Sequence, residues 1–437
     1  MSASRNAGTR TVAAWCFYDW ANSAFTTMVV TFVYATYFTK TFAANEDLGT
    51  ELWSKGIVVS AILIALLSPV LGTMADRGGA RLRALILATL VCVMATVALT
   101  FVAPGGNNAV VLALGIFVVA NVAFEVGMVF YNAFLPAIVP RERIGRVSGY
   151  GWGLGYIGGL MALVVGLVGF VGLGDMSPIL PLPTELGFNI RATNLLVAGW
   201  FLVFSIPAFI YLKDAPATGK GQGLDLRGTF TEVANTFRQI RQYREVVKFL
   251  LARLIYNDGL VTVFAFGAIY AAGTFGMSIG EVMIFGIVLN LAAGAGAFLF
   301  GFIDDKVGGK TTIMVSLVAL SIATVIAVLA PTRAWFWVAG IGIGMFVGPN
   351  QSASRSLMGR FVPERHQAEF FGFFAFSGKA TAFMGPLLFG ELSGAFGQRV
   401  GMGSVLLFFV IGGVMLLTVS EKAGIEAAQR GSGAAGL

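Results

Sequence analysis

Five ionisable side chains stand inside long apolar runs of this 437-residue chain, namely Asp19, Glu125, Arg253, Asp258 and Lys379. A charged group at the centre of a membrane-spanning helix costs about 2.5 to 3.5 kcal/mol on insertion scales, so each one needs a partner or a wet cavity. Ionisable groups in such positions bind ions or polar solutes, or carry protons. These residues are therefore the first candidates for a functional site.

Two kinds of chemistry are open to them. Asp19, Glu125 or Asp258 could accept hydrogen bonds from an ammonium group, and Lys379 or Arg253 could donate to a carboxylate, as a zwitterion such as an amino acid requires. The same acids could also carry protons as coupling ions. The alternative is structural: the groups merely pair with one another, for instance Asp258 with Lys379.

Neutral polar side chains accompany the charged ones at helical spacing. Glu125 and Asn132 are seven residues apart, and Asp258 and Thr262 are four apart, so each pair shares one helix face. We predict that these faces line a pathway for a small-molecule substrate or for protons. The polar residues assigned to that pathway beside the charges are Asn22, Asn132, Asn257, Asn350 and Ser354.

The elements that hold these residues are apolar helices. Hydrophobic residues make up 57% of the chain and charged residues 12%, whereas a soluble domain is about 25% charged. Runs of about 20 apolar residues can cross a hydrocarbon core of about 30 Å as helices, and lipid offers the backbone no hydrogen bonds, so the fold class is an all-α membrane protein. Twelve transmembrane helices are predicted, at 12–38, 55–75, 82–103, 109–135, 147–173, 192–212, 246–272, 279–303, 311–331, 334–357, 368–394 and 401–420.

Basic residues are distributed unequally between the two sides of these spans. Most of the 29 Lys and Arg residues fall on the side of the N-terminus, Arg355 and Arg360 at the end of the tenth span among them. By the positive-inside rule both termini face the cytoplasm. This pattern accounts for the net charge of +7, so the lipid bilayer is an expected partner and nucleic acid is not. We expect a monomeric, multi-pass protein of the bacterial inner membrane.

A long polar stretch divides the chain near its middle. Residues 1–212 are predicted to form an N-terminal six-helix bundle, 213–245 a cytoplasmic linker, and 246–420 a C-terminal six-helix bundle. The tail, 421–437, is small and polar, and we expect it to be disordered.

The linker begins Gly-rich and then becomes amphipathic. This pattern is typical of a helix at the lipid surface, or of a helical lead-in to the seventh span. The apolar residues at helical spacing are Phe230, Val233, Phe237 and Ile240.

One spacing of Gly, Asp and basic residues occurs twice, about half the chain apart. In each copy Asp follows Gly by four positions, a base comes next, Gly follows two later, and a second base two after that. Repetition at this distance indicates an internal duplication. The two copies consist of Gly72, Asp76, Arg77, Gly79 and Arg81, and of Gly301, Asp305, Lys306, Gly308 and Lys310.

This paired motif resembles the loops between helices 2 and 3, and between helices 8 and 9, of the major facilitator superfamily. The resemblance implies two six-helix bundles around a central cavity, lined by helices 1, 4, 7 and 10, that rock about a site at mid-membrane. It also implies that the ten motif residues form a cytoplasmic gate, in which Asp76 and Asp305 are latch residues.

Longer stretches resemble one branch of that superfamily, the vacuole-effluxer-like family, whose fungal members release amino acids from the vacuole. The resemblance implies an amino-acid-like substrate. The stretches are WCFYDWANSAF from Trp15, FYNAFLPAIVP from Phe130, RVSGYGWGLGYIGG from Arg146, FLLARLIYNDG from Phe249 and QSASRSLMGRFVPERHQAEFFGFF from Gln351.

The sequence contains no motif that would support an enzymatic function. No phosphate-binding loop, zinc-binding HExxH motif or Ser/His/Asp arrangement is present, so we expect no enzyme activity, cofactor or metal. Cys16 and Cys92 lie inside predicted spans and are interpreted as packing residues.

Two alternatives to amino-acid transport stay open. One is a proton-coupled exporter of other small or hydrophobic compounds. The other is a non-transporting receptor or scaffold, which predicts a sealed centre.

Overall fold

The computed structural model describes residues 8–106, 108–172, 176–214 and 243–433, which fold into helices joined by short loops. The linker helix predicted around Phe230 lies outside these residues. The first half contains α1 (Thr9–Ala24), the π-helical segment η1 (Phe25–Phe32), α2 (Tyr34–Thr41), α3 (Glu46–Gly78), α4 (Arg81–Phe101), α5 (Ala109–Ile138), η2 (Arg141–Arg143), α6 (Ile144–Gly166), η3 (Leu167–Val171), η4 (Glu185–Gly187), α7 (Phe188–Arg191) and α8 (Thr193–Tyr211). The second half contains α10 (Arg244–Phe275), α11 (Ile279–Val307), α12 (Gly309–Leu329), α13 (Arg333–Phe361), α14 (Gln367–Lys379), α15 (Met384–Phe396), α16 (Gln398–Gly403), α17 (Val405–Leu417) and α18 (Glu421–Gly433).

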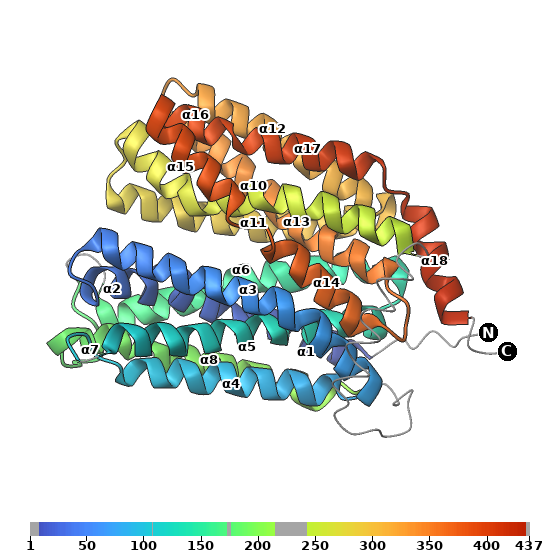
Figure 1. Cartoon of the computed structure of the whole chain (residues 1–437), viewed down its shortest axis with the longest axis horizontal. Helices are drawn as coiled ribbons and strands as arrows, with labels where there is room; N and C mark the ends of the chain where they lie inside the picture. The colour runs from blue at the N-terminus through green and yellow to red at the C-terminus, as the bar shows by residue number, and fades with distance from the viewer. Residues whose placement is uncertain (1–7, 107, 173–175, 215–242, 434–437) are drawn as a thin grey trace.

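The helices form two bundles that pack side by side (Figure 1). Helices α1 to α8, coloured blue to green, make up the first bundle, and α10 to α17, coloured yellow to red, make up the second. We call the end formed by α18 and by the α3–α4 and α11–α12 loops the latch end, and the opposite end, with α2, α7 and α16, the far end. Helix α1 begins and α17 ends at the latch end, as an even number of crossings requires.

Nine helical stretches among the described residues are long and apolar enough to cross a membrane. They correspond to all the predicted spans except 12–38, 334–357 and 368–394. The first of these three is divided among α1, η1 and α2, and the last between α14 and α15, while α13 is made more polar by residues such as Asn350 and Ser354. Broken or polar helices need protein or water around them, so these three are the natural place to look for a site.

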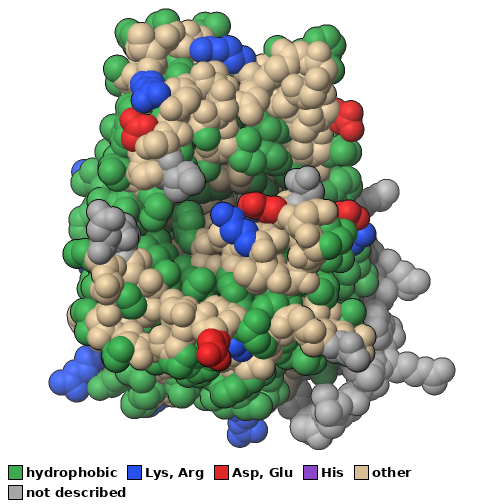
Figure 2. Space-filling view, turned by 90° about the vertical axis from the view of Figure 1, so that its left-hand side faces the viewer, with side chains coloured by type: hydrophobic (Ala, Val, Ile, Leu, Met, Phe, Trp, Pro, Cys, Tyr) green, Lys and Arg blue, Asp and Glu red, His purple; other side chains and the backbone are tan. Residues whose placement is uncertain are grey.

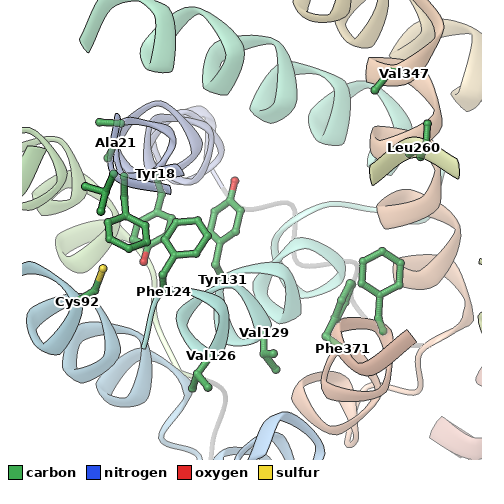
Figure 3. Packing of buried hydrophobic residues seen from close by; sticks show 14 of the residues in the cluster. Tyr18, Ala21, Cys92, Phe124, Val126, Val129, Tyr131, Leu260, Val347 and Phe371 are labelled. Atoms are coloured by element: carbon green, nitrogen blue, oxygen red, sulfur yellow. The ribbon is translucent and has the colours of Figure 1, made fainter. Parts of the chain in front are cut away.

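An aromatic core ties α1 to α5 in the first bundle. The ring centroids of Trp15 and Tyr131 are 4.5 Å apart, and those of Tyr18 and Tyr131 are 4.8 Å apart, both pairs being stacked. Figure 3 shows Tyr18, Phe124 and Tyr131 beside one another, with Phe371 on a helix of the second bundle on the other side of Val129. The core packs α1 against α5 and so sets the orientation of the polar side chains of α1. Cys16 and Cys92 are buried free thiols, as expected for packing residues.

Small residues bring the two bundles into backbone contact. A Cβ atom at Gly149 on α6 would clash with the carbonyl oxygen of Ala297 on α11, and one at Gly372 on α14 would come within 2.7 Å of the Cα atom of Pro69 on α3. Glycine at such contacts lets membrane helices approach closely and gain van der Waals energy. The bundles are thus joined along two seams, α6 with α11 and α3 with α14.

The tail is ordered where the sequence predicted disorder. Residues Glu421–Gly433 form α18, and the Glu421 carboxylate accepts hydrogen bonds from the backbone N–H groups of Gly309 (3.1 Å) and Lys310 (2.9 Å). These groups open α12 and have no partner within that helix. The prediction was wrong for 421–433 because composition alone gives no sign of these donors, which lie over a hundred residues away from the tail in the chain.

Candidate functional site

A cavity of about 300 Å³ lies between the two bundles. Side chains of α1, α5 and α6 form one wall, and side chains of α10, α13 and α14 form the other. Nine of the ten residues predicted for the substrate or proton pathway line it: Asp19, Asn22, Glu125, Asn132, Arg253, Asn257, Asn350, Ser354 and Lys379.

The charges on the cavity wall are sorted by bundle. The acids that line it, Asp19 and Glu125, belong to the first bundle, and the bases that line it, Arg253, Arg355 and Lys379, belong to the second. An electric field therefore runs across the cavity from one bundle to the other. A solute that carries both signs of charge would be oriented by this field.

The first ion pair lies deep in the cavity. The Arg355 guanidinium donates from Nη1 to Oδ2 of Asp19 at 2.8 Å, and also to the side chain and the backbone carbonyl of Ser148 at 2.9 and 2.7 Å. It lies 4.8 Å from the ring centroid of Trp15 and 5.5 Å from that of Trp152. The side chains of Arg355 and Asp19 are only 2% and 7% exposed, so this pair is enclosed and fully coordinated.

The second ion pair is more open. Nζ of Lys379 lies 2.6 Å from Oε1 of Glu125, and these side chains are 33% and 19% exposed. Lys379 ends α14, roughly 18 Å along that helix from its latch-end start, whereas Arg355 is roughly 9 Å from the latch end of α13, at 1.5 Å per residue. Exposure therefore increases from the latch end toward the far end.

Arg253 has no carboxylate partner among the described residues. Its Nη1 donates to the carbonyl oxygen of Phe374 at 2.7 Å and to Oγ of Ser377 at 2.8 Å. Its guanidinium carbon lies 3.6 Å from the centroid of the Phe374 ring, a cation–π contact. Neutral acceptors hold this cation, so its charge is available to an anionic group in the cavity.

Asp258, the tenth predicted residue, does not line the cavity. It is 1% exposed and lies behind the wall, where Oδ1 accepts a hydrogen bond from Thr381 at 3.2 Å. The hypothesis that Asp258 pairs with Lys379 was wrong, since Lys379 pairs with Glu125. Helical spacing had placed Asp258 and Thr262 on one face, but that face is turned toward α15 and not toward the cavity.

The first copy of the repeated motif holds the bundles together at the latch end. Asp76, at the end of α3, accepts hydrogen bonds from the backbone N–H groups of Ala368 (3.1 Å) and Glu369 (2.9 Å) in the first turn of α14. It also accepts from Nε of Arg81 at 2.7 Å, and Arg81 donates in turn to Gln367. A carboxylate is favoured at a helix N-terminus by the free N–H groups and the helix dipole.

The second copy repeats the contact with the bundles exchanged. Asp305 on α11 accepts from the backbone N–H of Arg146 at 3.2 Å, in the first turn of α6, and from the guanidinium group of the same residue. The leading glycines match too: a Cβ atom at Gly72 would clash with the carbonyl group of Ala368, and one at Gly301 would come within 2.9 Å of Arg146 Cα. Each copy thus docks a Gly and an Asp on the start of a helix in the other bundle.

The other motif residues have more local tasks. Gly79 and Gly308 have φ angles of 55° and 91° and end α3 and α11, a conformation in which glycine is unstrained. Lys310 donates to two carbonyl oxygens near the end of α17, so it does not bridge the bundles as Arg81 does. Lys306 is exposed, and the side chain of Arg77 lies outside the described part of the structure.

The far end is hollowed between the bundles. Figure 2 views this end and shows a recess between the two lobes. The two latch contacts and the enclosed Asp19–Arg355 pair close the opposite end. The structure is therefore a state in which the cavity is closed toward the latch end.

Comparisons with known proteins agree with this architecture. Residues 51–429 match the family described as "Vacuole effluxer Atg22 like". The chain belongs to that family. The Atg22-like chain is 29% identical over 422 residues, 95% of its own length and 96% of the relative's, to the uncharacterized MFS-type transporter YxiO of Bacillus subtilis. It is 24% identical to autophagy-related protein 22-1 of Penicillium rubens over 277 residues, which span 45% of that longer protein.

Solved structures share the fold of this Atg22-like chain. The proton:xylose symporter XylE superposes with a TM-score of 0.73 and 12% identity, covering 96% of this chain and 98% of its own. The fucose:proton symporter FucP of E. coli gives 0.72 at 14% identity, covering 94% and 98%. The fold is therefore that of the major facilitator superfamily. The protein is a multi-pass membrane transporter, and its relatives are not enzymes.

Sequence reasoning missed the most heavily coordinated residue of this Atg22-like site. Arg355 was counted among the basic residues on the cytoplasmic side, at the end of the tenth span, but it lies inside α13 and is buried. A signal was present in the sequence: Gln351, Ser354 and Arg355 follow Asn350 by one, four and five positions. Residues at this spacing form one polar stripe on a helix. Among the described residues no group of His, Cys, Asp or Glu could hold a metal ion.

Proposed function

We propose that this transporter moves a small zwitterion, an amino-acid-like solute, by alternating access. The observation that carries the proposal is the sorting of charge: carboxylates of one bundle face cations of the other across a single cavity. A cavity of about 300 Å³ suits a small solute, since ligand pockets run from roughly 300 to 1,000 Å³.

The Glu125–Lys379 pair is where such a solute would bind. Its ammonium group would replace Lys379 as the donor to Glu125, and its carboxylate would replace Glu125 as the acceptor for Lys379 and Arg253. Every charge then keeps a partner, so the desolvation cost of breaking the pair is offset. A solute with only one charged group would leave either the acid or the bases without a partner.

Binding in this pose would connect the two bundles through the solute. The Asp19–Arg355 pair, enclosed by aromatic rings, would remain in place while the solute binds and would hold the bundles in register beneath it. Transport to the latch side would then require this pair to separate and Asp76 and Asp305 to leave the helix starts on which they dock. If the termini are cytoplasmic, as the basic residues predict, the latch end is the cytoplasmic gate and this state is open toward the outside.

The rivals are less well supported. An exporter of hydrophobic compounds would be served by a largely apolar cavity, but five ionisable side chains line this one. A receptor or scaffold would have a sealed centre, whereas the cavity here contains an ion pair with a partly exposed lysine. We further propose that the membrane is a bacterial inner membrane and that the protein acts as a monomer.

The test is counterflow in proteoliposomes that contain the purified full-length chain. A panel of labelled amino acids is compared with the matched amines, which lack the carboxylate, and the matched acids, which lack the amino group. The variants Glu125→Gln and Lys379→Gln are measured beside Glu51→Gln, whose carboxylate pairs with the exposed Lys55 on α3.

We expect saturable counterflow of at least one amino acid, no flux of its amine or acid analogue, and a loss of at least tenfold in both cavity variants but not in Glu51→Gln. Equal flux of the amine analogue would contradict the zwitterion proposal. Absence of flux for every amino acid would remove the proposed substrate class and leave the fold unaffected.

A further inference from the structure

A buried carboxylate outside the cavity has no part in the mechanism described so far. Asp258 on α10 is 1% exposed, and while Oδ1 accepts from Thr381 at 3.2 Å, Oδ2 is buried without a hydrogen-bond partner. Buried polar groups in proteins are nearly always paired, so an orphaned carboxylate oxygen requires an explanation. A bound proton would make the carboxyl group neutral and so remove the largest cost, which is that of a buried charge.

Among the residues that the structure describes, no cation is paired with Asp258. On α10 itself, Arg253 is bound to Phe374 and Ser377. On α14, Lys379 is paired with Glu125. On α15 the ionisable residue is Glu391, which is exposed. Helix α17 has no ionisable residue, and its Phe409 side chain packs on the glycine that follows Asp258.

The place of Asp258 links it to the substrate cavity. Thr381, its hydrogen-bond partner, belongs to the short break between α14 and α15 and also donates to the carbonyl oxygen of Leu254. A Cβ atom at Gly385, just beyond the break, would come within 2.8 Å of the Asp258 carbonyl oxygen. The break is thus packed directly on Asp258, and Lys379 of the cavity ion pair ends the helix two residues before Thr381.

We propose that Asp258 is the coupling-proton site of this transporter, separate from the substrate site and connected to it through Thr381 and the break between α14 and α15. A proton from solution binds Oδ2 of the carboxylate and gives the neutral acid, and its release on the other side restores the charge. The change at Asp258 alters the hydrogen bond to Thr381 and so the position of Lys379. This inference rests on the proposed transport of a zwitterion and adds the coupling ion.

The test separates exchange from accumulation in proteoliposomes. Counterflow at equal pH needs no net proton movement, whereas accumulation against a solute gradient does when a pH gradient drives it. We expect Asp258→Asn to keep counterflow within about threefold of the parent, to lose accumulation, and to abolish the substrate-induced pH change of an internal dye. The matched control is Asp214→Asn, which follows α8 and whose carboxylate accepts a hydrogen bond from the Leu82 N–H at the start of α4; this variant should keep accumulation.

Persistent gradient-driven accumulation in Asp258→Asn would overturn the proposal. A second measurement covers the case in which that variant does not fold. Dicyclohexylcarbodiimide reacts with protonated carboxyl groups in apolar surroundings, and peptide mass spectrometry of the parent locates the product. Modification at Asp258 that a saturating amino acid does not block supports a separate proton site, whereas modification at Glu125 and not at Asp258 contradicts it. The position of the modified residue can be determined even if the parent transports none of the amino acids. Absence of transport would refute the proposed substrate and would leave the proton site to be decided by this labelling.

Discussion

Arg355 of the second bundle and Asp19 of the first form a buried ion pair at 2.8 Å, although 336 positions separate them in the chain. Two tryptophan rings and Ser148 enclose the guanidinium group. The pair joins α1 of the first bundle to α13 of the second, so it is a direct link between the bundles. The Glu125–Lys379 pair is nearer the far end and more exposed, and it is the pair that we propose exchanges partners with a solute.

Breaking the enclosed pair should destabilise the protein strongly. Asp19→Asn or Arg355→Gln alone leaves a buried charge without its partner, which costs about 3 to 5 kcal/mol. The double variant should lose less than the sum of the two single losses, because neither charge remains. The measurement is the free energy of unfolding in mixed micelles, with Arg333→Gln as a control: its partner Glu281 is exposed, so the loss there should stay below about 1 kcal/mol.

Exchanging the charges of the Glu125–Lys379 pair should preserve the stability of the fold but not transport. Glu125→Lys combined with Lys379→Glu keeps the two charges adjacent but places the new carboxylate beside Arg253. We expect unfolding close to that of the parent, and amino-acid counterflow still reduced at least tenfold, because Arg253 then competes for the carboxylate that should bind the solute ammonium group. Full counterflow in the exchanged variant would show that the sorting of charge by bundle does not matter.

Weakening either latch should open the latch end. Asp76→Asn and Asp305→Asn remove charge-assisted hydrogen bonds, each worth about 1.5 to 3 kcal/mol, which corresponds to a shift in population of roughly 10- to 150-fold. The rate at which a thiol reagent modifies a cysteine introduced at Ser354 should rise when the reagent is added on the latch side. Lys306→Gln, in the same motif but exposed, serves as the matched control and should leave the rate unchanged.

A single methyl group in a seam between the bundles should disturb their packing. In Gly149→Ala the new Cβ would meet the carbonyl oxygen of Ala297, while in Gly199→Ala on α8 it would meet nothing within 4 Å. We expect Gly149→Ala to cost about 1 to 3 kcal/mol, the range for overpacked sites, and to slow transport. Gly199→Ala should be neutral or slightly stabilising. Equal thermal stability of the two variants in detergent would show that the α6–α11 seam tolerates separation.

Much of the contact at the latch end could be predicted from the sequence because its signal is local. The Gly and Asp spacing occurs once in each bundle, and the structure places Asp76 and Asp305 on equivalent helix starts. The role of the last motif base could not be predicted in the same way. Arg81 bridges the bundles through Gln367, while Lys310 binds within its own bundle, because different partners happen to lie opposite the two turns.

For the cavity, too, some features could be predicted from the sequence and others could not. Nine of the residues that line the cavity could be predicted because they are polar or charged and lie inside long apolar runs. A charge inside such a run is costly in lipid, so it indicates a partner or a wet cavity. The sequence by itself therefore determined the membrane class, the duplicated plan and the set of unusual polar side chains. Only the tertiary structure decided which of them meet: that Lys379 pairs with Glu125, that Arg355 lies inside the protein, and that Asp258 is turned away from the cavity. Those pairings depend on how helices of different bundles are rotated and offset against one another, and helical periodicity within one segment carries no information about the helix that will face it.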